Sequence, residues 1–445
     1  MEKEPGQPEI YNEIPEDAPE VMERFSKELL VKEDQEIPEN VFEQLLEKHN
    51  LEFQRALEEL LSLWETKEHR KTLGHDQVHI SYDLLEFLYL SEQGGLKNSE
   101  KYMVLFGSLL HDLGRYPELL LKERSGAMDF KKGKQIQFHA ALSGYLGSMF
   151  AKKHKAKEDD SQIIEASKAF NRRVIGATLF HGGKNEERDP VAHHVQSIDR
   201  LAGILGSREF VRNVVTDGAQ RGAAVYPDER LSYDEAFPLF NNLPVEEFSE
   251  ASEPQNSWTN IVHYLEMPLR NMFPLSTEYG MERSKAMKRE SGIILTFLAG
   301  GKDTSLYAQI FAPELNPIGE YKFPKNRIPQ DIWQEIEKGI NEEETAEMKK
   351  YEGKKFQELV KIMLFQQAPD AASAEIGKVC QLFEEVPDHH QEDARRAVQY
   401  VVARRSLNKK IERQFLQEKK QSSDPLVSNI ATHLLKNELF SGKVK

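Results

Sequence analysis

The chain has 445 residues, a length that allows two to four domains or one large body with extensions. Its 74 acidic and 59 basic side chains give a formal net charge of −15, so we expect no general nucleic-acid binding. The single cysteine, Cys380, excludes a disulfide framework and any metal site built from several cysteines. No apolar run is long enough to cross a membrane, and the first residues lack an apolar signal core. We therefore expect no membrane span and a cytoplasmic location.

The N-terminal region carries most of the negative charge. Residues 1–40 hold 13 acidic and 4 basic side chains together with five prolines. Such a composition buries too little apolar surface to offset the entropy lost on ordering, so we expect residues 1–20 to form a disordered acidic tail. Apolar residues then recur at three- and four-residue steps through 41–73, which predicts a helical extension over 21–73.

The middle of the chain has mainly helical patterns and few strand signals. Residues 206–260 are rich in Pro, Asn and Ser and are typical of a long irregular insertion. Helical patterns resume before residue 300, and four prolines follow between 306 and 329. We therefore predict one body over 74–305 that contains this insertion, followed by a linker over 306–329.

Residues 330–445 have helical patterns throughout and predict a separate C-terminal helical domain. Within them, residues 401–445 carry 10 basic and 4 acidic side chains. A solvated helix face is one interpretation of this charge. A surface that binds a protein partner, the acidic N-terminus or a second copy of the chain is the other. The predicted fold class for the whole chain is all-α.

Histidines and aspartates at intervals along the middle region are the strongest chemical signal. His111 and Asp112 are adjacent, with His75 and His79 upstream at a spacing of one helical turn. Downstream lie His139, His181 and Asp199. Each lies on or beside an apolar helical stretch, which directs its polar group toward the interior of a bundle.

Burying carboxylates beside imidazoles is costly unless another charge compensates them. A divalent metal ion provides that charge, and helix bundles build such sites from inward-facing side chains of different helices. We therefore expect one or two divalent ions, chosen among Mn, Fe, Co, Ni, Zn and Mg. A bound ion lowers the pKa of a water molecule and makes hydroxide available near neutral pH.

Several segments resemble the HD-domain metal-dependent phosphohydrolases. These are GHDQVH (74–79), LLHDLGR (109–115), VQSIDRLAGILG (195–206) and the helix over 277–298. The resemblance covers roughly residues 70–300 and is nearest to small stand-alone bacterial members with a Gly-His-Asp-x-x-His start. It implies an HD-type helical bundle that hydrolyses a phosphomonoester or nucleotide through a metal-bound hydroxide.

The resemblance also implies two sets of metal ligands that share Asp112, a residue with a catalytic role. The first set is His79, His111, Asp112 and Asp199, and the second is Asp112, His139 and His181. The family's Arg-Val pair, three and four residues after the first histidine, is replaced here by Tyr82 and Asp83. This departure leaves His75 as a rival to His79.

Two basic residues are candidates for binding a small phosphorylated substrate. Arg115 lies one helical turn after the His-Asp pair, and arginine binds phosphate in a bidentate way. Lys184 follows two glycines in a turn whose backbone amides could face an anion. A surface salt bridge is the alternative interpretation of Arg115.

Two other functional classes fit the same pattern. A di-iron oxygenase on the same scaffold is one, because histidine and aspartate also bind iron in sites that activate O₂. The other is a regulatory protein that uses the HD body as a ligand sensor and the C-terminal helices for partner binding.

Overall fold

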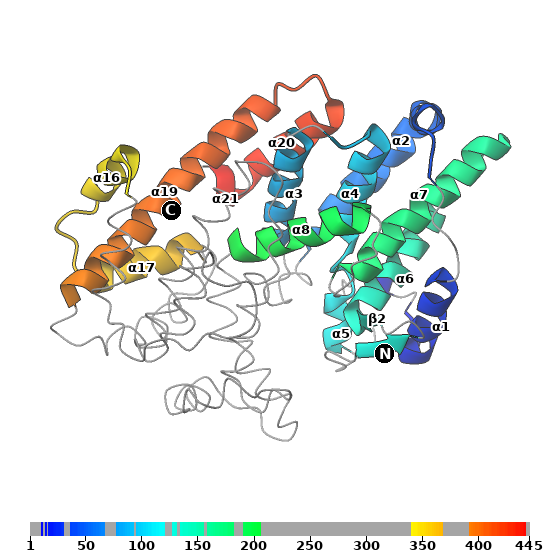
Figure 1. Ribbon diagram of the computed structural model, residues 1–445, viewed down its shortest axis with the longest axis horizontal. Helices are drawn as coiled ribbons and strands as arrows, with labels where there is room; N and C mark the ends of the chain where they lie inside the picture. The colour runs from blue at the N-terminus through cyan, green and yellow to red at the C-terminus, as the bar shows by residue number, and fades with distance from the viewer. Residues whose placement is uncertain are drawn as a thin grey trace, which may run out of the picture. The chain divides into compact units, whose positions relative to one another are not determined.

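The structure is a computed structural model whose described part is predominantly helical, as the sequence predicts (Figure 1). The chain divides into two compact units, residues 1–202 and 203–445. The expected insertion over 206–260 and linker over 306–329 lie outside the described residues, and the predicted domain boundaries stay predictions. The described residues are 10–11, 14–15, 17–30, 36–66, 77–92, 95–120, 127–130, 134–154, 158–181, 190–205, 340–367 and 391–441.

The first unit combines a helical body with one short hairpin. The strands β1 and β2 are antiparallel, with Ala127 opposite Gln137, and β2 leads directly into α6. The elements are α1 (Ala18–Leu30), α2 (Glu39–Trp64), α3 (Gln77–Glu92), α4 (Asn98–Leu110), α5 (Arg115–Leu120), β1 (Ala127–Phe130), β2 (Lys134–Gln137), α6 (Phe138–Lys153), α7 (Ser161–Phe180) and most of α8 (Pro190–Leu205).

Helix α3 packs on α4 and carries a long run of buried residues. Every residue from His79 to Tyr89 is buried, so the helix is enclosed on all sides. Its apolar positions lie on all of its faces, which is typical of a helix surrounded by others. Any polar side chain in this stretch, such as Asp83, is therefore held away from solvent.

The predicted N-terminal extension belongs to the same body. Rings from α2, α4 and α7 form an aromatic cluster, in which Phe53 and Phe170 meet edge to face at 5.4 Å. The Trp64 indole donates a hydrogen bond of 2.8 Å to the carbonyl of Leu109, near the end of α4. Helix α2 therefore supports the end of α4, where the His-Asp pair begins.

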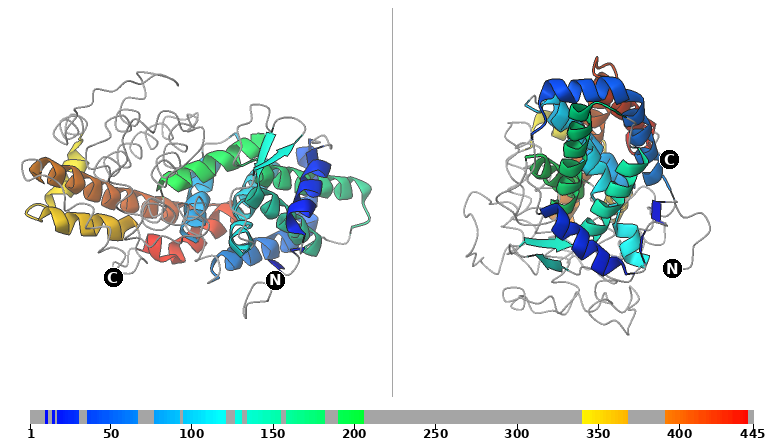
Figure 2. Two further views of the ribbon diagram at one scale, coloured as in Figure 1. Left: turned by 90° about the horizontal axis from the view of Figure 1, so that it is seen from below. Right: turned by 90° about the vertical axis from the view of Figure 1, so that its right-hand side faces the viewer.

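The structure differs from the expected disordered tail in the part of residues 1–20 that it describes. Helix α1 begins at Ala18, and Met22 is buried against residues of α6 and α7. Tyr11 is 1% exposed, and its ring lies 5.5 Å from that of Tyr116 in α5. Figure 2 shows α1 beside α6 and the hairpin. The apolar residues among the acidic ones account for this difference, because they bury surface that the net charge alone does not reveal.

In the described part of the second unit, α19 contacts each of the other helices. The Arg404 guanidinium donates to Glu344 at 2.8 Å, and the Gln399 amide donates to the carbonyl of Met348 at 2.8 Å. None of the described helices in either unit is long and apolar enough to span a membrane. The helices of the second unit are α16 (Glu342–Lys349), α17 (Phe356–Gln367), α19 (Gln391–Lys419), α20 (Pro425–Lys436) and α21 (Glu438–Ser441).

Candidate metal centre

Two histidines occupy equivalent positions, each directly after a helix of the first unit. His111 caps the C-terminus of α4, and His181 caps that of α7. In each ring Nδ1 lies 2.7 Å from the carbonyl oxygen three residues earlier, that of Ser108 or Thr178. A carbonyl only accepts, so Nδ1 carries the proton and donates it. The lone pair of a neutral ring is therefore on Nε2, which leaves that nitrogen available to a metal ion.

The first group of donor atoms comes from α3, α8 and the turn after α4. His79 Nε2 lies 3.1 Å from Asp199 Oδ1, and His111 Nε2 lies 3.2 Å from Asp112 Oδ2. His111 Nε2 is also 3.4 Å from Asp199 Oδ1. Donors about 2.1 Å from one ion lie roughly 3.0–3.4 Å apart, so these separations suit a shared divalent cation. All four donors lie within 4.8 Å of one another.

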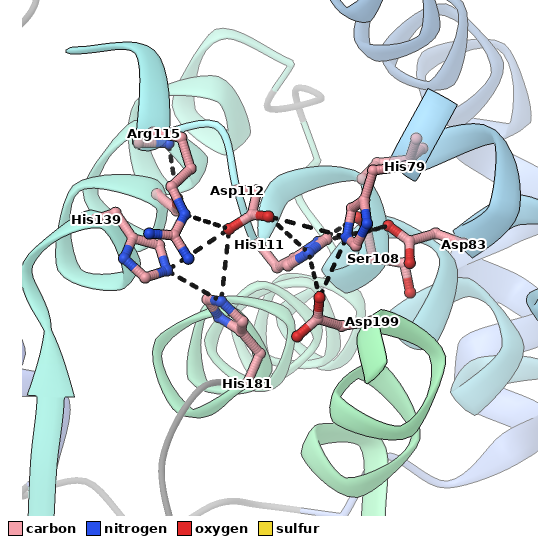
Figure 3. Close-up of polar contacts among 12 residues, drawn as sticks. His79, Asp83, Ser108, His111, Asp112, Arg115, His139, His181 and Asp199 are labelled. Carbon is pink, nitrogen blue, oxygen red and sulfur yellow. Dashed lines mark hydrogen bonds and ion pairs between the residues drawn. The ribbon is translucent and has the colours of Figure 1, made fainter. Parts of the chain in front are cut away.

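The second group shares Asp112 with the first. Asp112 Oδ1 lies 3.5 Å from His139 Nε2 and 3.6 Å from His181 Nε2, and the two Nε2 atoms are 3.2 Å apart. These three donors also lie within 4.8 Å of one another. Figure 3 shows Asp112 between the two groups, with one carboxylate oxygen directed to each. Asp112 can therefore bridge two ions.

A tight turn brings Asp112 to His139. The chain leaves α4 at His111 and enters α5 at Arg115, with the Arg115 amide donating to the carbonyl of Asp112 at 3.0 Å. Within the turn, the Gly114 amide donates to Ser143 Oγ of α6 at 2.7 Å. A Cβ at Gly114 would lie 2.2 Å from the carbonyl oxygen of His139. Only glycine permits this approach, which sets the separation of the two ligand-bearing segments.

Helix α8 packs against the end of α7 and contributes the last member of the first donor group. Gln196 donates from Nε2 to the carbonyl of His181 at 2.7 Å, which ties α8 to the end of α7. One turn further on, Asp199 directs its carboxylate to His79 and His111. Its side chain is 20% exposed, whereas those of Asp112 and His111 are 1% and 0% exposed. Asp199 is therefore the partly exposed member of these three side chains.

Opposite charges dominate the electrostatics of the first group. Burial by itself would lower the pKa of His111, but Asp112, Asp199 and Asp83 hold it well above the usual value. Burial would likewise raise the pKa of Asp199, but the neighbouring imidazoles of His111 and His79 hold it well below its usual range. Without a metal ion, the group therefore favours a protonated imidazole among ionised carboxylates.

A further carboxylate, Asp83, lies beside the first group, although the sequence pattern did not predict it as part of the site. It lies one helical turn after His79 on α3 and is fully buried. Its Oδ2 atom is 3.7 Å from His79 Nε2 and 3.9 Å from His111 Nδ1. Burial raises the pKa of Asp83 to about 7. The i, i+4 spacing to His79 is the sequence signal that could have identified it.

The residues fit a divalent metal by an independent criterion. Among the described residues, His111 Nε2 is buried and makes no hydrogen bond of acceptable geometry, although two carboxylates lie within 3.4 Å of it. Buried polar atoms are normally paired, and a cation in the space that this nitrogen faces would supply the missing partner. The described helices thus enclose a buried His/Asp cluster that resembles an HD metal site.

Of the three remaining candidate residues, the structure describes only Arg115. Arg115 donates from Nε to Asp112 Oδ1 at 3.2 Å, and its side chain is 22% exposed. This residue therefore lies at the His/Asp cluster and still reaches solvent. His75 and Lys184 lie outside the described residues.

Comparisons of the chain with protein-family models, with curated proteins and with solved structures found no match. A functional conclusion for this chain therefore depends on the geometry of the two donor groups.

Proposed function

We propose that this protein is a metal-dependent phosphohydrolase of the HD type that acts on a phosphomonoester or nucleotide. The observation that supports this proposal most strongly is the position of Asp112, whose two oxygens face two separate sets of histidine and aspartate donors. His79, His111 and Asp199 would hold one ion with Asp112, and His139 and His181 the other. Paired divalent ions lower the pKa of bound water and neutralise charge on a phosphoryl group that undergoes displacement.

The protein's own side chains would orient these ions and bind the substrate. The carbonyls of Ser108 and Thr178 fix the protons of His111 and His181 on Nδ1, so that both Nε2 atoms remain donors to metal. Arg115 lies beside Asp112 at a partly exposed position, where its planar guanidinium would bind phosphate oxygens. Lys184 remains a proposed second phosphate contact.

The test begins with metal content and turnover in the purified full chain. We expect one or two transition-metal ions per chain, and hydrolysis of at least one member of a panel of phosphomonoesters and nucleotides supplied with Mn²⁺, Mg²⁺, Co²⁺ or Ni²⁺. Asp112→Asn should lose both ions, because Asp112 contributes to both groups, whereas His139→Ala should lose only one. Helix content measured by circular dichroism should stay near the wild-type value in both variants.

A matched control distinguishes the loss of a metal ligand from a general effect of substituting a histidine. His154 pairs with Glu59 at 2.9 Å and belongs to neither donor group, so His154→Ala should keep its metal ions and its turnover. Uptake of O₂ by the iron-loaded protein, without phosphate release from any substrate, would favour the oxygenase instead. A protein that carries no metal, or an Asp112→Asn variant that retains both ions, would contradict the proposal.

A further inference from the structure

A buried carboxylate outside both donor groups lies against the first of them. Asp83 is 0% exposed, and among the described residues neither of its oxygens has a hydrogen-bond partner. A buried polar group without a partner costs free energy, and an ionised one costs more. Its position on the enclosed helix α3 therefore opposes folding unless some other interaction compensates for it.

The surroundings of Asp83 indicate where that compensation comes from. Its Oδ2 atom faces two rings of the first group, 3.7 Å from His79 Nε2 and 3.9 Å from His111 Nδ1. Figure 3 shows its carboxylate beside the His79 ring. Neither His139 nor His181 forms a described ion pair with Asp83, so the carboxylate belongs to one side of the site.

A nearby hydroxyl offers a comparison. Ser108 Oγ is also buried without a hydrogen-bond partner among the described residues, and the Ser108 carbonyl contacts the same His111 ring. Ser108 is neutral, whereas Asp83 can carry a negative charge. Any effect specific to the charge should therefore appear at Asp83 and not at Ser108.

We propose that Asp83 is a positioning carboxylate of the first metal position: its charge, held beside His79 and His111, strengthens binding of a divalent cation there and leaves the second position unaffected. A cation held by the two imidazoles would supply the positive charge that is otherwise missing beside the negative Asp83 carboxylate. The carboxylate in turn adds a third negative charge, besides those of Asp112 and Asp199, around that cation. This inference rests on the proposed metal-dependent function.

The isosteric substitution Asp83→Asn tests the inference. The metal-free full chain is titrated with Mn²⁺ in a calorimeter, and its thermal midpoint is measured before any metal is added. We expect one of the two Mn²⁺ affinities to weaken by about 10–100-fold, as is typical for residues that act on metal ligands, and the other to stay unchanged. At pH 8, where the Asp83 carboxylate is ionised, the metal-free variant should be at least as stable as the wild type, because a buried charge without hydrogen-bond donors has been removed. Asp83→Ser provides a second variant should the asparagine fail to fold.

Ser108→Ala is the matched control and should keep both Mn²⁺ affinities. The combination of weaker metal binding and undiminished metal-free stability is the signature of a metal-directed role, since a purely structural residue would lose both together. Unchanged Mn²⁺ affinities in Asp83→Asn would overturn the inference, and so would equal weakening of both positions with a lower thermal midpoint. A wild-type protein that binds no Mn²⁺ or other divalent ion would instead overturn the proposed function itself.

Discussion

Gly114 offers a direct test of how the turn after α4 sets the metal centre. In Gly114→Ala the new Cβ would lie 2.2 Å from the His139 carbonyl oxygen, 2.7 Å from Leu142 Cβ and 2.8 Å from Ser143 N. Ordinary contact begins near 3.4 Å, so the turn and α6 must separate by about 1.2 Å, the difference between 3.4 and 2.2. Overpacking of this kind costs about 1–3 kcal/mol, and a weakened bond between the Gly114 amide and Ser143 Oγ adds about 1 kcal/mol.

We therefore expect Gly114→Ala to lower the free energy of unfolding by about 3 kcal/mol and to weaken the second metal position, because Asp112 and His139 move apart. Chemical denaturation followed by circular dichroism measures the first effect, and metal content measures the second. Gly176→Ala is the matched control. This glycine lies inside α7, and apart from its chain neighbours and the nearby backbone of α7 no atom lies within 4 Å of its would-be Cβ, so alanine should stabilise the protein by about 1 kcal/mol. Equal unfolding free energies for wild type and Gly114→Ala would refute the close-packing argument.

Two further predictions concern stability. Trp64→Phe should lower the free energy of unfolding by about 1–3 kcal/mol, because the buried carbonyl of Leu109 loses the indole donor; denaturation with an unchanged midpoint would contradict this. The metal-free protein should lose stability between pH 5 and pH 8. The pKa of Asp83 is about 7 in the folded protein against 3.8 for the free side chain, so a total penalty of about 4 kcal/mol develops as pH rises from 4 to 7, and about 2.5 kcal/mol of it falls above pH 5. The raised pKa of His111 acts in the same direction, since its contribution is complete below pH 6.5 and is lost as pH rises toward the folded pKa. The lowered pKa of Asp199 adds no slope here, because its contribution is lost only below about pH 4. A thermal midpoint that stays constant or rises from pH 5 to pH 8 would show that these groups are not buried as described.

The local pattern of the sequence was enough to predict helices and the residues with metal-binding chemistry. Three- and four-residue spacing of apolar side chains through residues 41–73 predicts α2, because helix periodicity depends only on neighbours along the chain. The order of histidines and aspartates along the chain predicted the candidate metal ligands. The structure brings six of these residues together in two groups, although residues 79 and 199 are 120 positions apart in sequence.

Other features follow only from how the helices pack. Charge and proline content predicted disorder near the N-terminus, yet Tyr11 and α1 pack on α5 and α6 through a few apolar side chains. The overall composition of a segment hides a few apolar side chains among many charged ones. Each of those apolar side chains can still be buried and stabilise the segment.

The second group, and the place of Asp83 beside the first, depend on which helix faces meet. The sequence alone determined that Asp83 shares a helix face with His79, because four residues make about one turn. Only the tertiary structure decided that this face is enclosed and that His111 approaches it from the end of α4. The close contact of Gly114 with α6 is likewise a contact between segments distant in sequence. Local periodicity fixes which side chains are neighbours on one helix, but the electrostatics of a buried site arise from neighbours that packing brings in from other helices.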